Sequence, residues 1–107
     1  MTRKKTSART EENIFADLGL DNAEELDAKA ALVFQISHII RKRGLTQVAA
    51  GKLLGVNQSE VSRLLRGELD NFSMQKLLDF AMRLNRDVEI TLKPRAKGLG
   101  HMTVVTA

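Results

Sequence analysis

Residues 45–67 of this 107-residue chain are LTQVAAGKLLGVNQSEVSRLLRG, which predicts two short helices joined by a turn. Thr46 and Asn57 precede the two helical runs, and side chains of this kind cap a helix by accepting a backbone N–H of its first turn. Gly55 separates the runs, and glycine adopts the left-handed turn conformation without strain. Two short helices around a glycine turn are typical of a DNA-binding helix-turn-helix.

The two short helices are expected at residues 47–54 and 58–65, after a longer helix from residue 23 to about residue 43. Asn22 can cap the longer helix, and Gly44 can end it. Its apolar residues share one face. They are Leu32, Val33, Ile36, Ile39 and Ile40, and the face is widened by Leu26, Ala30, Ala31 and Phe34. A stripe of this width can contact a second subunit as well as the core of its own chain.

A further helix and a strand are predicted after the motif. Ser73 can cap a helix that ends near residue 84 and closes the bundle. Residues 87–93, DVEITLK, alternate apolar and polar side chains with the period of a strand, and Pro94 stops it. The other β-like stretch, at 103–106, is short, so we expect the strand to pair with its copy in a second subunit. This predicts a two-fold dimer.

The length of the chain permits one domain with a modest core. Aliphatic residues are plentiful, aromatic residues make up 4% and there is one Pro, which favours helices. We therefore expect an all-α fold with a C-terminal strand. The expected organisation is a flexible arm over residues 1–21, with a short helix at 11–18, a DNA-binding domain over 22–93, and a flexible tail over 94–107.

The net charge of +4 is unevenly distributed along the chain. Residues 11–27 include acidic residues but no Lys or Arg. The acidic residues are Glu11, Glu12, Asp17, Asp21, Glu24, Glu25 and Asp27. Between Lys29 and Arg86 the balance is reversed, with more Lys and Arg than Asp and Glu. A positive surface of this kind attracts phosphate, although it identifies nucleic acid only in combination with a motif.

Membrane insertion and secretion are not expected. No apolar run approaches the roughly 18 residues that a membrane span needs. Residues 1–10, MTRKKTSART, are basic but lack the apolar stretch of a signal peptide. We therefore expect a cytoplasmic protein, and the absence of Cys fits a reducing compartment.

Enzymatic chemistry is not expected either. The two histidines, His38 and His101, have no further His or Cys at ligand spacing, so we expect no metal site. The sequence contains no phosphate loop, dinucleotide fingerprint, nucleophile elbow or paired catalytic carboxylates. We predict a protein without a cofactor that is not an enzyme.

The helix-turn-helix resembles that of the Cro/phage-repressor family, also called the XRE family. The resemblance rests on Gln47 at the start of the first helix, the small residue Gly51, the turn pair Gly55 and Val56, and the apolar residues Val61 and Leu64. It implies a lambda-repressor-like helical domain. Gly51 departs from the family's common Ala, and it lets the crossing helix approach at a cost of roughly 1 kcal/mol in helix propensity.

The second short helix carries the predicted base contacts. If Val61 points inward, a turn of about 100° per residue places Ser59, Ser62, Arg63 and Arg66 on the outward face. The family resemblance implies readers at Gln58, Ser59 and Arg63, with Ser62 as a fourth. Arg can donate two hydrogen bonds to guanine, Gln can pair with adenine, and Ser suits several bases weakly.

Other polar residues are predicted to contact phosphate. Gln47 resembles the family's phosphate-binding glutamine. Asn57, Arg66 and Lys76 lie where the turn and the following helix would meet the DNA backbone. Such contacts position a reading helix without specifying sequence, although Arg66 and Lys76 are equally compatible with plain solvated charges.

Two functions remain open at this level. The first is a repressor that reads a palindromic operator on double-stranded DNA through the major groove as a homodimer. The second is an antitoxin that neutralises a small RNase-type toxin and regulates its own operon, because residues 13–94 are similar in layout to a HigA-like subgroup. RNA binding is disfavoured, since the chain lacks Tyr and Trp and we expect its four Phe to be buried.

Overall fold

The computed structural model describes residues 22–106, so the predicted arm over 1–21 and its helix at 11–18 lie outside the described residues. The elements are α2 (Asn22–Lys42), α3 (Gln47–Leu54), α4 (Gln58–Leu65), the 3-10 helix η2 (Leu69–Asn71) and α5 (Met74–Arg83). The four helices predicted within the described residues are confirmed. The structure adds η2, a single short turn between α4 and α5.

Polar caps begin the three shorter helices. The side chain of Thr46 accepts the N–H of Ala49 at 3.0 Å, and that of Asn57 accepts the N–H of Glu60 at 2.8 Å. Ser73 caps α5 in the same way. Each cap satisfies a backbone donor that the helix leaves without a partner, typically worth about 1 kcal/mol. These local contacts explain why the helices begin where the sequence predicts.

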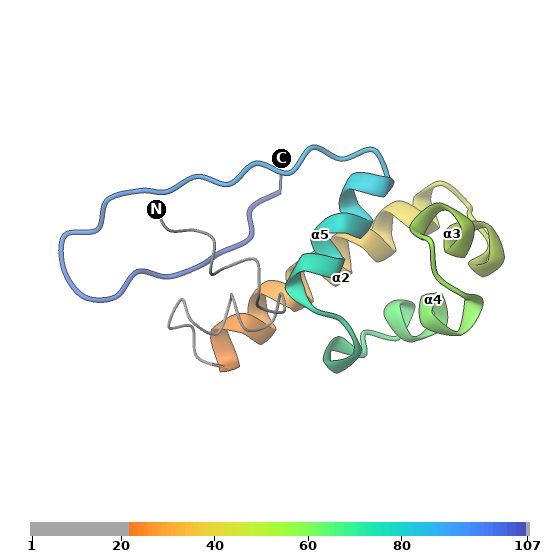
Figure 1. Ribbon diagram of the computed structural model, residues 1–107, viewed down its shortest axis with the longest axis horizontal. Coiled ribbons are helices and arrows are strands. Elements are labelled where there is room, and N and C mark those ends of the chain that lie inside the picture. Colours follow the sequence, from red (N-terminus) through yellow and green to blue (C-terminus); the bar gives the residue numbers. More distant parts are fainter. Residues whose placement is uncertain (1–21, 107) are drawn as a thin grey trace, which may run out of the picture.

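The core lies between α2 and the three shorter helices. In Figure 1, α5 lies along α2, while α3 and α4 lie at one end of the molecule. Buried apolar residues come from all four α-helices of the described part, and the largest that are almost fully enclosed are Ile36, Ile40, Val61, Leu64, Leu77, Phe80 and Leu84. Each such side chain contributes about 1.5–3 kcal/mol by leaving water. α4 is therefore held in place by side chains that enter the common core.

The expectation that the phenylalanines are buried is only partly correct. Phe72 and Phe80 are buried and meet edge to face, with ring centroids 5.8 Å apart. Phe34 is 68% exposed, and its neighbours on α2, Leu26 and Ala30, are exposed as well. The apolar stripe of α2 is wider than the surface that α5 and α4 cover, so its outer edge remains in solvent. Phe15 lies outside the described residues.

The predicted strand at 87–93 is absent, and the described part of the chain contains no strand. No hydrogen bond between backbone groups joins residues 87–106 to another described residue. Figure 1 shows this segment running away from α5 and returning towards α2. A hollow lined by Ile90, Leu92, Met102 and Val104 separates the two runs. A strand needs backbone groups of a neighbour, and the described chain supplies none at this position.

The returning run is attached to the helical body. The backbone N–H of Met102 donates to the carboxylate of Glu24 at 2.9 Å, and the ring of His101 lies 3.1 Å from the same oxygen. Met102 and Val104 pack against the core. The outgoing run, which is the part that follows α5 and includes residues 87–93, has no such attachment. Its residues Ile90 and Leu92 are 76% and 92% exposed. We call residues 86–106 the C-terminal arm.

Gly51 has a structural role that differs from the expected one. A Cβ on Gly51 would lie 2.6 Å from the carbonyl oxygen of Val56, which belongs to the turn and not to the crossing helix. The same turn is closed by the N–H groups of Gly55 and Val56, which both donate to the carbonyl of Gly51. The glycine therefore allows the turn to fold back over the end of α3.

We predict that Gly51→Ala lowers the free energy of unfolding by about 1–3 kcal/mol, because the methyl group overpacks against backbone that cannot move easily. Helix propensity alone would raise it by roughly 1 kcal/mol. Urea denaturation followed by circular dichroism measures the change. The control is Ala49→Gly in the same helix, which we expect to destabilise by roughly 1 kcal/mol through propensity. A stabilised Gly51→Ala protein would contradict the prediction.

Candidate nucleic-acid interface

The outward face of α4 carries the predicted base readers. Val61 and Leu64 are buried on its inner side. Gln58 and Ser59 are exposed in the first turn, and Ser62 and Arg63 are half-buried further along. Because two inward anchors fix the rotation of an eight-residue helix, these polar side chains face away from the core together.

Two glutamines join the N-terminal ends of α3 and α4. The side-chain N–H of Gln58 donates to the side-chain oxygen of Gln47 at 3.3 Å. Sequence reasoning gave these residues separate roles, one on a base and one on phosphate, and the structure brings them together. A glutamine amide has two donors and one accepting oxygen, so both side chains retain donors for a ligand. The pair presents a polar edge that can bridge two acceptors.

Arg63 is placed differently from the other arginines of the helical body. Its side chain makes no hydrogen bond or ion pair with another residue of the described part, although its backbone carbonyl accepts the N–H of Glu68. By contrast, Arg41 donates to the carbonyl of Leu65, Arg43 to the carbonyl of Leu84, and Arg83 to Asp79. The planar guanidinium of Arg63 therefore retains its five N–H donors on the outward face of α4.

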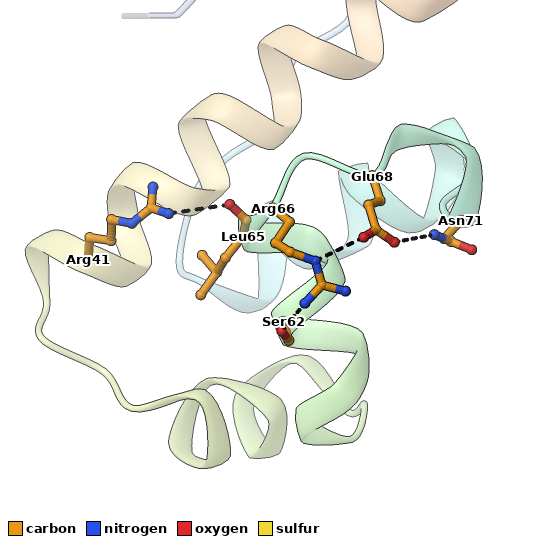
Figure 2. A network of polar contacts seen from close by, with 6 residues as sticks. All are labelled: Arg41, Ser62, Leu65, Arg66, Glu68 and Asn71. Carbon is orange, nitrogen blue, oxygen red and sulfur yellow. Dashed lines mark hydrogen bonds and ion pairs between the residues drawn. The ribbon is translucent and has the colours of Figure 1, made fainter.

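Arg66 is the centre of a polar network at the other end of α4 (Figure 2). It donates from Nη1 to the hydroxyl of Ser62 at 2.7 Å and from Nε to Glu68 at 2.9 Å. Glu68 also accepts from the side chain of Asn71 at 3.2 Å. Sequence reasoning predicted Ser62 as a base reader and Arg66 as a phosphate contact, and the structure joins them.

Glu68 and Asn71 were missed by sequence reasoning because they lie beyond α4. The only local signal was an acidic residue two positions after an arginine. Arg41, also missed, donates to the last turn of α4 at 3.3 Å from the end of α2. Its position in the sequence, 24 residues away, gives no sign of this contact.

The remaining predicted phosphate contacts are Lys76 and Asn57. Lys76 is half-buried in the first turn of α5. Its ammonium lies 3.7 Å from the carboxylate of Glu60 of α4, so it is paired within the chain. The oxygen of Asn57 is used in capping α4, which leaves its amide N–H groups for a ligand. Both residues lie at the margins of α4, where contacts to a DNA backbone would occur.

The described residues contain no group of His, Asp or Glu that could hold a metal ion. No helix within residues 22–106 is long and apolar enough to span a membrane. Every buried side-chain nitrogen or oxygen in that range has a hydrogen-bond partner.

Comparisons with known proteins agree with this geometry. A family model described as a helix-turn-helix domain matches residues 14–93. A solved structure described as an XRE family transcriptional regulator is 36% identical, covers 81% of this chain and 100% of its own, and superimposes with a TM-score of 0.74. No curated protein matches the sequence.

Proposed function

The chain belongs to the XRE-type helix-turn-helix DNA-binding transcriptional regulators, and from that premise we propose that it is a repressor that reads a palindromic operator as a homodimer. The observation that carries the proposal is the outward face of α4. It presents Gln58, Ser59 and the uncommitted Arg63 on a short helix anchored by two buried side chains. A helix of this kind fits the major groove of DNA.

Arg63 is proposed as the principal base reader. A guanidinium donates two parallel hydrogen bonds to O6 and N7 of guanine, which no other base offers in the same pattern. Gln58 can pair with adenine, and its contact with Gln47 fixes the direction in which its amide points. Ser59 is exposed beside it and can contact several bases.

Gln47, Asn57, Arg66 and Lys76 are proposed as phosphate contacts around this reader. They come from α3, the turn, the end of α4 and α5, so they surround the exposed face of α4. Contacts of this type determine the register of a protein on DNA and add affinity that falls with salt. The pairing of Lys76 with Glu60 means that a phosphate competes with a carboxylate for this lysine.

We expect Arg63→Ala to lose preference at one base position, at a cost of about 1–3 kcal/mol for the preferred sequence. Lys76→Ala should weaken binding to all sequences alike and lower the salt slope by about 1. Selection from random duplexes, followed by titrations at several salt concentrations, measures both effects. Arg95→Ala, a matched arginine change on the C-terminal arm, should leave the preference intact. If the unaltered protein enriches no sequence, the proposal fails.

Dimerisation is proposed because apolar side chains are exposed at a distance from α4. Ile90 and Leu92 alternate along the outgoing run of the C-terminal arm, which has unused backbone donors and acceptors. Pairing with the same run of a second copy would satisfy these groups. A two-fold dimer presents two α4 helices to half-sites about one helical turn of DNA apart, which requires a palindrome.

Sedimentation at micromolar concentration should therefore show a dimer, and Ile90→Asp combined with Leu92→Asp should produce a monomer with weakened operator binding. Ile90 and Leu92 lie outside the core, so the helical circular dichroism signal should not change. Thr91→Asp places one negative charge on the opposite side of the run and should remain dimeric. Equal effects of the two changes, or a protein that is monomeric on its operator, would exclude pairing through this run.

An antitoxin function is the second candidate, and the N-terminal half of α2 favours it. Exposed Leu26, Ala30 and Phe34 adjoin the acidic residues Glu24 and Asp27. Figure 1 shows this half of α2 at the end of the packed helices that is away from α3 and α4. A small basic protein could bind there while α4 remains open to DNA. Of the other acidic residues within 11–27, Glu25 lies 3.6 Å from the ammonium of Lys29, and Glu11, Glu12, Asp17 and Asp21 lie outside the described residues.

Co-expression with the neighbouring gene tests this candidate. If an antitoxin, the tagged protein should retain a small basic product that cleaves RNA when released. Phe34→Asp should lose that product and keep DNA binding. Arg63→Ala should retain the product and weaken binding to the preferred DNA sequence. The candidate is rejected if the neighbouring product does not copurify, or if its retention is indifferent to Phe34→Asp.

A further inference from the structure

We propose that Glu68, supported by Asn71, is a positioning residue that fixes Arg66 and Ser62 for contact with DNA; this inference rests on the proposed function. Both supporting residues lie outside the helix-turn-helix, in and beside η2. Figure 2 shows the chain of contacts running from Asn71 through Glu68 and Arg66 to Ser62. The four side chains therefore form one unit that connects η2 with the outward face of α4.

The hydrogen-bond roles in this unit are complementary. The two carboxylate oxygens of Glu68 are divided between Asn71, which donates to Oε1, and Arg66, which donates from Nε to Oε2. Arg66 then donates from Nη1 to Ser62. A guanidinium has five N–H donors, so three remain after these two bonds. Those three donors, fixed in direction, suit the oxygens of a phosphate group.

The same arrangement orients the hydroxyl group of Ser62. A serine hydroxyl can both donate and accept, and its hydrogen normally rotates to suit its neighbours. Because the oxygen accepts from Arg66 at 2.7 Å, the hydroxyl hydrogen must point elsewhere. The hydroxyl hydrogen and the second lone pair of Ser62 therefore remain for a ligand, in directions limited by the bond from Arg66.

Fold stability does not explain the network. The side chains of Arg66 and Glu68 are 59% and 41% exposed, and ion pairs at such exposure contribute little to folding. A carboxylate this close to a DNA-facing arginine also repels phosphate. The presence of Glu68 is explained if orienting Arg66 and Ser62 favours recognition of DNA by more than the positive charge that Glu68 neutralises would.

The experiment compares three variants on two duplexes. The duplexes are the sequence that the unaltered protein enriches from random DNA and a shuffled sequence of the same composition. Glu68→Ala removes charge and acceptors, whereas Glu68→Gln removes the charge but keeps an oxygen that can accept from Arg66. Asp70→Ala is the matched control, because Asp70 is exposed in η2 and has no ion pair among the described residues.

We expect Glu68→Ala to reduce the affinity ratio of the two duplexes by roughly fivefold to tenfold, the lower part of the range for one lost specific contact. Glu68→Gln should retain most of the ratio, and Asp70→Ala all of it. If Glu68 acts only by repulsion, all three variants will bind both duplexes more tightly and leave the ratio unchanged, which overturns the inference.

A measurement on the DNA-free protein separates this inference from the proposed function. In nitrogen-15 spectra, the Nε–H of Arg66 should be protected from exchange in the unaltered protein and in Asp70→Ala, and should lose protection in Glu68→Ala. Protection that survives Glu68→Ala overturns the positioning role even if the protein reads DNA. Normal protection with no enriched sequence would overturn the proposed function and leave Arg66 positioned for another ligand.

Discussion

The burial of Val61 and Leu64 is the constraint on which the rest of the interface depends. These two residues enter the common core, where α4 packs against α3 and α2, and they fix both the position and the rotation of α4. A helix of eight residues has little stability of its own, because isolated helices of that length are marginal in water. The outward direction of Gln58, Ser59 and Arg63 is therefore a consequence of apolar packing on the opposite side.

Polar contacts then secure α4 at both ends. The Gln58 amide contacts Gln47 at the start, and Arg41 donates to the carbonyl of Leu65 at the end. Glu60 meets Lys76 along one side. Each contact is exposed and individually weak, but each connects α4 to a different element. A reading helix that is held in this way loses little further freedom when it binds, which favours affinity.

Contacts within a few residues made the helices predictable from the sequence. Features that depend on a neighbour distant in the sequence could not be predicted in this way. Thr46, Asn57 and Ser73 satisfy backbone donors a few residues away, so their caps were visible in the sequence. The alternation over residues 87–93 indicated a strand, but a strand exists only beside a neighbour, and the described chain provides none. Phe34 lies on the apolar face of α2, yet the packed helices are too narrow to cover it.

The sequence by itself determined the helices, the turn at Gly55 and the set of polar residues on the outer face of α4, because these depend on contacts within a few residues and on helical period. Tertiary structure alone decided which of those residues remain available. Gln58 contacts Gln47 of α3, Glu60 pairs with Lys76 of α5, and the side chain of Arg63 is left without a partner among the described residues. The physical reason is that a side chain's partners are set by distances between separate elements, which helical period does not specify.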